Sequence, residues 1–203
     1  MERKEIYLAG GCFWGTEKYL KSIPGVKMTE VGYANGIIPN PSYEDVCHRN
    51  TGHAETVRVK YEPKYITLTH LLNLFFQVID PTSVNRQGND IGNQYRTGIY
   101  YVDPKDETII LAAITELQKK YDKRIAVEIK PLKNYYPAEE YHQDYLTKNP
   151  NSYCHIEKDA FDRHANPLSI RRPPLLYQQR LAPLHPQGKY GGRGVREIPA
   201  NIR

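Results

Sequence analysis

The order of strand and helix patterns is the feature that most constrains how this chain can fold. Apolar runs and alternating residues mark strands, whereas apolar residues three or four apart mark helices. The patterns run strand, helix, strand, strand, helix, strand, over residues 6–9, 13–23, 27–33, 54–61, 68–79 and 98–102. This order predicts an α+β fold with a two-layer, ferredoxin-like (split βαβ) core. A helix through Tyr121, a strand over 125–129 and a helix over 137–146 should extend that core.

Composition divides the 203 residues into one globular domain, 1–165, and a coil-rich tail, 166–203. The tail holds six prolines, four glycines and a surplus of six basic residues, which is typical of a linker. The first 165 residues then carry a net charge of −1, which gives no support to a nucleic-acid partner. The longest apolar run, 109–114, is too short to cross a membrane, and the charged N-terminus does not resemble a signal peptide. We therefore expect a monomeric protein of the cytoplasm, with no membrane partner.

Three cysteines, at positions 12, 47 and 154, make an odd count. In a reducing compartment this favours redox chemistry, metal binding or inert burial over a structural disulfide framework. A zinc site is not expected, because no Cys-x-x-Cys pair is present.

Cys12 follows Gly10-Gly11 at the end of the first strand and opens the first helix. The free N–H groups at a helix N-terminus favour a thiolate, so this position predicts a nucleophile with a lowered pKa. The alternative is a small, buried apolar side chain. Cys47 lacks a comparable setting, and we interpret it as structural.

Glu55 lies in the strand over residues 54–61 and shares its parity with Val57, Val59 and Tyr61. A carboxyl group on that apolar face would have a raised pKa and could serve as a general acid. Parity alone leaves open that Glu55 turns to solvent at the strand end.

Two later segments also hold candidate functional groups. The polar stretch 85–96 is long for a compact domain, and Asp90 and Tyr95 are its hydrogen-bonding candidates unless it is simply a solvated loop. Cys154 follows Asn-Pro-Asn-Ser-Tyr near the end of the domain. A cysteine on such a segment suits a resolving thiol, which attacks an oxidised partner.

Six segments, spread over residues 5 to about 156, carry a specific resemblance. They read Gly-Cys-Phe-Trp-Gly (11–15), Gly-Tyr-Ala-Asn-Gly (32–36), Asn-Pro-Ser-Tyr (40–43), Thr-Gly-His-Ala-Glu (51–55), Gly-Asn-Asp (88–90) with Gln-Tyr-Arg (94–96), and Tyr-His-Gln-Asp-Tyr-Leu (141–146). In this order they resemble the peptide methionine sulfoxide reductase A family. The Tyr-Cys-His-Ile segment at 153–156 most resembles the type A half of fusions with a type B reductase.

The resemblance implies a thioredoxin-dependent repair enzyme for oxidative damage, with no bound cofactor or metal. Its substrates would be free methionine sulfoxide and oxidised proteins, at the S epimer, with thioredoxin or a dithiol as external reductant. By this resemblance Cys12 would be the nucleophile that becomes a sulfenic acid, and Glu55 would be the proton donor. The hydroxyls of Tyr43 and Tyr95 would bind the sulfoxide oxygen, and the carboxylate of Asp90 would organise this polar group. Phe13 and Trp14 would form the methyl pocket, and Cys154 would be the resolving thiol that forms a disulfide with Cys12.

The chain departs from the family pattern in two places. Some relatives carry two late cysteines, whereas this chain has only Cys154, and residues 166–203 match nothing in the family. A cysteine hydrolase that pairs Cys12 with His53 or His142 is the rival enzyme class, because it would not need Cys154. A binding domain whose tail engages proline-recognition modules is the non-enzymatic alternative.

Overall fold

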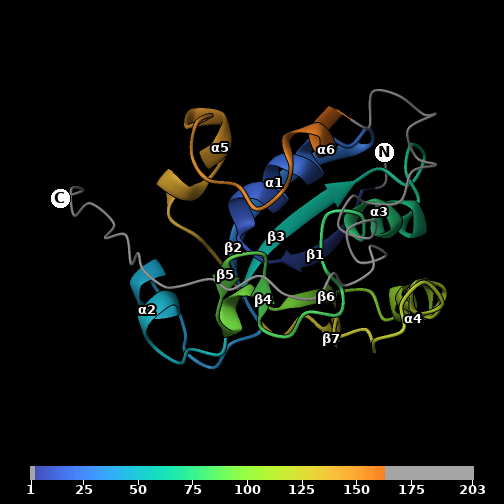
Figure 1. Cartoon of the computed structure of the whole chain (residues 1–203), viewed down its shortest axis with the longest axis horizontal. Coiled ribbons are helices and arrows are strands. Elements are labelled where there is room, and N and C mark those ends of the chain that lie inside the picture. The colour runs from blue at the N-terminus through green and yellow to red at the C-terminus, as the bar shows by residue number, and fades with distance from the viewer. Residues whose placement is uncertain (1–2, 163–203) are drawn as a thin grey trace, which may run out of the picture. The chain divides into compact units, whose positions relative to one another are not determined.

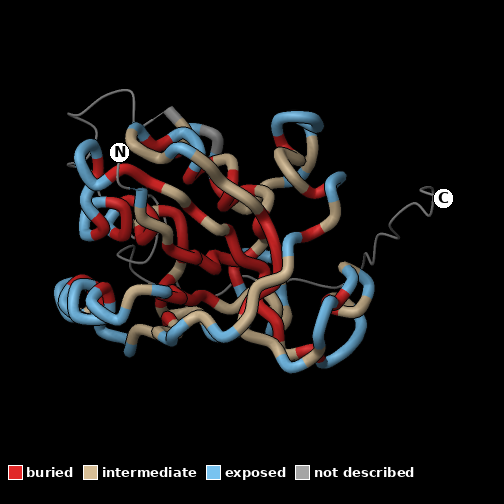
Figure 2. Tube along the Cα trace, turned by 180° about the vertical axis from the view of Figure 1, so that it is seen from behind, coloured by how far each residue is buried: buried red, intermediate tan, exposed pale blue. Residues whose placement is uncertain are grey.

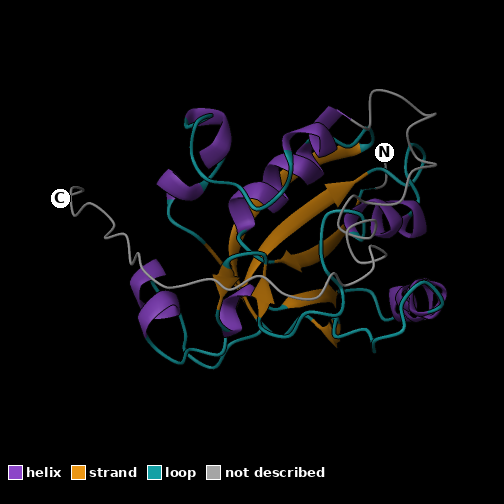
Figure 3. Cartoon of the chain, in the orientation of Figure 1, coloured by secondary structure: helices purple, strands orange, loops and turns teal. Residues whose placement is uncertain are grey.

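The computed structural model describes residues 3–162, and the predicted tail, 166–203, lies outside the described residues. The described part is an α+β fold in which one mixed sheet carries its main helices on one face (Figures 1 and 3). Within it, no helix is long and apolar enough to cross a membrane.

The sheet has six strands in the order β7-β6-β1-β3-β2-β8. All neighbours are antiparallel except β6 and β7, which are parallel. At the centre, Val57 pairs with Leu8 on one side and with Val31 on the other. The strands are β1 (Lys4–Gly10), β2 (Val26–Ala34), β3 (Ala54–Tyr61), β6 (Thr97–Tyr101), β7 (Glu128–Pro131) and β8 (Tyr135–Pro137). A separate two-stranded hairpin joins β4 (Arg86–Gln87) to β5 (Asp90–Ile91).

The two faces of the sheet are covered by different sets of side chains. Alternate residues such as Leu8, Val57 and Ile99 form one core with the apolar sides of helices α1 and α3. The opposite parity, including Tyr7 and Tyr100, forms a smaller second cluster. Figure 2 shows the buried segments gathered along the central strands. The helices are α1 (Phe13–Lys21), α2 (Tyr43–His48), α3 (Leu68–Phe75), α4 (Lys105–Gln118), α5 (Tyr145–Lys148) and α6 (Lys158–Asp162), with short 3₁₀ turns η1 (Asn93–Tyr95) and η2 (Glu140–His142).

Most of the elements expected from the sequence are present, and the strand over residues 54–61 has the predicted bounds. The expected helix over 137–146 was wrong, because the chain there forms the end of β8, then η2, and then turns at Asp144 with a left-handed φ of 54°. The strand expected over 125–129 lies instead at 128–131. Helix α2 was not predicted, although Ser42 and Asp45 form a capping box at its start.

Candidate active site

The site is built where the amino-terminal end of α1 meets the start of β3. Cys12 is the N-cap residue of α1, directly after the turn that ends β1. Gly11 adopts a φ of +85°, and a Cβ added there would lie 2.5 Å from the Gln87 side chain. Only glycine fits both the left-handed backbone and this close approach, so the turn fixes where the cysteine lies.

The pKa of Cys12 is the clearest difference from the sequence-based expectation. Burial raises the pKa of the thiol well above its usual value, and the nearby carboxylates of Glu55 and Asp90 raise it further. The backbone amides of Trp14 and Gly15 oppose this shift, as predicted for a helix N-terminus, but they do not prevail. In the substrate-free site Cys12 is therefore a thiol, and the expectation of a lowered pKa was wrong.

Glu55 is the second central group, and of the two orientations that parity left open, its side chain has the one that points into the protein. It is only 2 % exposed, and its Oε2 accepts a hydrogen bond of 2.9 Å from the backbone N–H of Phe13, the first residue of α1. Burial raises the pKa of Glu55 to about 8, against the effect of the Phe13 N–H group. The carboxyl group therefore keeps its proton at neutral pH, and it is hydrogen-bonded to the residue that follows Cys12.

Tyr43 and Tyr95 bring two phenol groups to the same place from separate elements. Tyr43 opens α2, where its backbone N–H donates to Oε1 of Glu139 at 2.9 Å, and Tyr95 ends η1. Burial raises the pKa of both phenols far above the usual value, and the Glu55 carboxylate adds to each shift. Both hydroxyls thus stay protonated and can donate hydrogen bonds beside Glu55.

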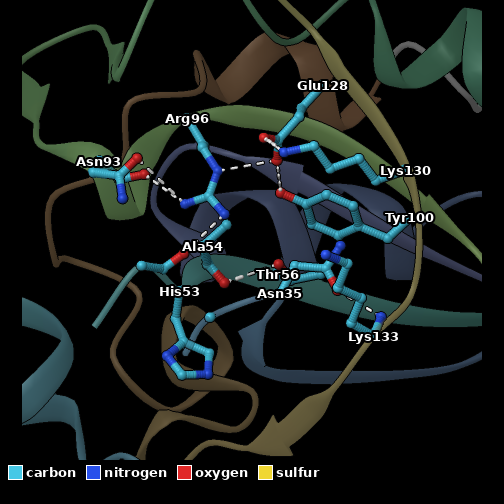
Figure 4. A network of polar contacts seen from close by, with 12 residues as sticks. Asn35, His53, Ala54, Thr56, Asn93, Arg96, Tyr100, Glu128, Lys130 and Lys133 are labelled. Carbon is cyan, nitrogen blue, oxygen red and sulfur yellow. Dashed lines mark hydrogen bonds and ion pairs between the residues drawn. The ribbon is translucent and has the colours of Figure 1, made fainter. Parts of the chain in front are cut away.

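Arg96 holds the Tyr95 turn against the loop before β3 (Figure 4). Its guanidinium donates to the carbonyl oxygens of Gly52 at 3.0 Å and Asn93 at 3.1 Å, and to Glu128 Oε2 at 3.1 Å. The same Glu128 oxygen accepts from the Tyr100 hydroxyl at 2.8 Å. Arg96, the neighbour of Tyr95, is thereby hydrogen-bonded to Gly52, which lies three residues before Glu55.

Phe13 and Trp14 form an aromatic wall at the start of α1, as the predicted methyl pocket requires. Their ring centroids are 6.5 Å apart, and Trp14 stacks on Tyr145 at 3.8 Å. His142, which the sequence offered only as a hydrolase base, instead accepts a 3.1 Å hydrogen bond at Nδ1 from the Trp14 indole, and its ring lies 4.4 Å from that of Tyr43. His142 is thus part of the wall.

The other predicted groups lie around these residues. Asp90 is in β5 with its side chain 18 % exposed, and burial raises its pKa. A methyl group added to Gly15 would lie 2.8 Å from Cys154 Sγ, so this thiol packs on the first turn of α1. Cys47 lies nearer the site than we expected, since it interacts with Tyr43 and its pKa responds to Glu55. All three cysteines are free thiols, and within residues 3–162 no cluster of three His, Cys, Asp or Glu side chains could hold a metal ion.

Several contributing residues were missed by the sequence analysis. Arg96 was quoted only within the Gln-Tyr-Arg motif, and the place of His142 in the wall went unrecognised. Their partners lie far along the chain, at Gly52 and Trp14, so no local pattern reveals them.

Comparison with known proteins agrees with this geometry. A family model described as peptide methionine sulfoxide reductase matches residues 4–170. A protein of Lachnoclostridium phytofermentans named peptide methionine sulfoxide reductase MsrA is 60 % identical over 163 residues, which cover 80 % of this chain and 98 % of that protein. Among solved structures, reduced Mxr1 of Saccharomyces cerevisiae is 43 % identical with a TM-score of 0.72, over 77 % of this chain and 92 % of Mxr1. Mxr1 in complex with Trx2 matches at 34 % identity with a TM-score of 0.50, over 71 % of this chain and 85 % of that chain.

A thiol at a helix N-terminus, a protonated carboxyl group beside it and these matches over most of the chain lead to one assignment: the chain belongs to the peptide methionine sulfoxide reductase A family.

Proposed function

We propose that the protein reduces methionine S-sulfoxide, free or within oxidised proteins, and that thioredoxin returns it to the thiol form. The observation that carries this proposal is the buried carboxyl group of Glu55 beside Cys12, with a pKa raised to about 8 by burial. A sulfoxide oxygen leaves sulfur only when it is protonated. A site that holds both a sulfur nucleophile and a neutral carboxylic acid meets that requirement.

In the first step the sulfur of Cys12 attacks the sulfoxide sulfur while Glu55 protonates the oxygen. That attack joins the two sulfurs. The protonated oxygen then passes to the Cys12 sulfur while the bonds from the substrate sulfur to oxygen and to Cys12 break. Methionine leaves, Cys12 becomes a sulfenic acid, and the thiol proton of Cys12 replaces the proton that Glu55 gave. The hydroxyls of Tyr43 and Tyr95 donate hydrogen bonds to the oxygen, and they can do so because both stay protonated. Asp90 organises this polar group, since its charge acts on both Cys12 and Glu55.

The aromatic wall receives the methyl group of the substrate. Phe13 is buried and Trp14 is partly buried, and the hydrogen bond from Trp14 to His142 fixes the indole plane. An apolar wall opposite the polar groups distinguishes the methyl substituent of sulfur from its oxygen. Because sulfoxide sulfur is a stereocentre, we propose that this arrangement selects the S epimer.

In the second step Cys154 attacks the sulfenic acid and forms a disulfide with Cys12, releasing water. The packing of Cys154 Sγ on Gly15, in the first turn of the helix that Cys12 opens, supports this pairing. Thioredoxin would then reduce the disulfide, as the complex of the related Mxr1 with Trx2 suggests. No bound cofactor enters either step.

Turnover on the separated S and R epimers of a methionine sulfoxide peptide, with thioredoxin as reductant, tests the proposal. We expect turnover of the S epimer alone. Cys12→Ser should abolish methionine release, because a hydroxyl is a far weaker nucleophile than a thiolate at neutral pH. Cys154→Ser should release one methionine per enzyme and then stop, while the matched Cys47→Ser variant should continue to turn over. Reduction of the R epimer, or sustained turnover by Cys154→Ser, would contradict the proposal.

Two finer assignments accompany this function. We propose that β1, β2, β3 and β6 with α1 and α3 form a ferredoxin-like unit, which the strand order β6-β1-β3-β2 supports. We also propose a cytoplasmic location, because the reaction cycle must end in free thiols and all three cysteines are free.

A further inference from the structure

His155, the residue after Cys154, is buried beside the proposed resolving thiol and has no assigned role. Its side chain is only 4 % exposed. By hydrogen-bond geometry neither ring nitrogen is paired among the described residues, although the Gly10 carbonyl interacts with the ring, and Oδ2 of Asp90 also lacks a hydrogen bond there. A buried polar atom without a hydrogen bond destabilises the fold, and buried structural histidines are normally hydrogen-bonded. Buried polar atoms that lack a full hydrogen bond, on His155 and on Asp90 beside it, therefore indicate a functional group.

The imidazole and the Cys154 sulfur lie against the same point on α1. A methyl group added to Gly15 would lie 2.8 Å from Cys154 Sγ, 3.4 Å from His155 Cε1 and 3.5 Å from His155 Nδ1. A methyl group on Gly11, the residue before Cys12, would lie 3.6 Å from the same Cε1 atom. The ring thus lies over the turn that carries Cys12 and next to the thiol that must reach it.

The surrounding charges suit a base that becomes protonated only briefly. Burial lowers the pKa of His155 to about 4, with the Gly10 carbonyl opposing the shift, so the ring is neutral and can accept a proton at neutral pH. Asp90 Oδ2, on β5, lies 3.8 Å from Nδ1 and would stabilise the imidazolium. Burial raises the pKa of Cys154, with Lys18 on α1 opposing, so this thiol needs a base.

We propose that His155 is the acid–base catalyst of the resolving step, an assignment that rests on the proposed function of Cys154. An imidazole nitrogen takes the Sγ proton of Cys154 as that sulfur attacks the sulfenic sulfur of Cys12. The sulfur–sulfur bond forms and the sulfur–oxygen bond breaks. The imidazolium then returns the proton to the departing hydroxide, so that the products are one disulfide and one water, with His155 neutral again.

The test separates the two steps in a single turnover of the full chain. Reduced, desalted protein is mixed with a methionine-S-sulfoxide peptide. Formation of the methionine form of the peptide, called methionine release below, reports the first step. Trapping of sulfenic acid with dimedone and mapping of the disulfide report the second. In His155→Gln we expect methionine release at the wild-type rate and disulfide formation slowed on the order of 100-fold, the scale of a positioned base. The exposed His70→Gln serves as the matched control and should change neither step.

The pH dependence gives a second readout that a purely structural role would not produce. Between pH 6 and 8 the wild-type rate of disulfide formation should be nearly flat, because His155 is already in its basic form. In His155→Gln the rate should rise about tenfold per pH unit, because only the small thiolate fraction of Cys154 then attacks. If the variant fails to fold, the wild-type profile alone decides: a tenfold rise per unit would overturn the proposal.

Other outcomes identify which assignment has failed. Disulfide formation between Cys12 and Cys154 at the wild-type rate in His155→Gln would overturn the role of His155 alone. Equal slowing of methionine release and disulfide formation in a folded variant would also overturn it, because His155 would then act through the substrate site. A disulfide between Cys12 and Cys47 in the wild type would instead overturn the proposed function of Cys154, and the role of His155 with it.

Discussion

Glu55 makes Cys12 harder to ionise, and burial makes both groups harder to ionise. Burial is the largest cause of both pKa shifts, and the Glu55 carboxylate adds directly to the shift of Cys12. Without substrate the pair is therefore a neutral thiol beside a neutral acid. Because the thiolate is the form that reacts with peroxides, this resting state protects Cys12 from oxidation that is not coupled to repair.

The first prediction follows from this effect of Glu55 on Cys12. Glu55→Gln keeps the shape and an oxygen for the Phe13 N–H group but removes the proton donor, so methionine release in a single turnover should slow by on the order of 10² to 10⁴. Above about pH 8, where Glu55 is ionised, the same change removes a negative charge near Cys12, so the pH profile of Cys12 alkylation by iodoacetamide should move to lower pH. General damage to the site would not slow reduction and speed alkylation together, so this pair of changes distinguishes the loss of the proton donor from such damage. An unchanged rate of reduction would assign the proton to another group, and the exposed Glu44→Gln provides the control.

At the scale of elements, Arg96 makes the position of Tyr95 depend on β3 and β7 together. One guanidinium joins the carbonyl of Gly52 before β3, that of Asn93 in η1 and the carboxylate of Glu128 in β7. A lysine can keep the charge pair with Glu128 but cannot make the three directed bonds at once.

We expect Arg96→Lys to lower kcat for the S-sulfoxide about tenfold by loosening the Tyr95 hydroxyl, since misplacement of about 1 Å can cost up to 100-fold. The rate at which thioredoxin reduces the preformed disulfide should not change, because that step does not use Tyr95. Steady-state turnover and stopped-flow reduction of the oxidised protein measure the two. Arg49→Lys, on an exposed side chain, is the control. Equal losses in both measurements would indicate that Arg96 only supports the fold.

The same scale shows what the sequence could reveal. Alternation along residues 54–61 predicted β3, because that signal is local, and it placed Glu55 on the apolar face without deciding whether its side chain is buried. The helix expected over 137–146 was wrong because partners far along the chain hold that backbone: the Gln143 amide bonds both backbone groups of Val31, and Glu17 accepts from the Asp144 N–H group. Arg96 and His155 escaped notice for the same reason. The role given to Tyr43 came from resemblance alone, whereas Tyr95 was already a hydrogen-bonding candidate within the polar stretch 85–96.

At the scale of the whole molecule, Glu55 is a source of instability that grows with pH. The folded protein keeps the Glu55 proton up to about pH 8, whereas a carboxyl group with the ordinary pKa of 4.5 releases it in the unfolded chain. Unfolding is therefore increasingly favoured as pH rises from about 5 to 8, by on the order of 5 kcal/mol in the limit.

Glu55→Gln should accordingly stabilise the protein in proportion to pH. We expect little change in the melting temperature at pH 5 and a gain on the order of 10 °C at pH 8, since about 1 kcal/mol corresponds to roughly 2 to 4 °C for a domain of this size. Thermal denaturation followed by circular dichroism measures both. The exposed Glu116→Gln should show no such dependence. A gain that is equal at both pH values would mean that the ionisation of Glu55 is not its cause.

Trp14 is the only tryptophan of the chain, and its indole stacks on Tyr145 and donates a hydrogen bond to His142. Indole emission shifts in wavelength and intensity with the polarity and contacts of the ring. All tryptophan fluorescence of this protein therefore originates in the wall where the substrate methyl group would bind. The molecule carries its own optical reporter, with which occupancy of the pocket and the redox cycle can be followed without a label.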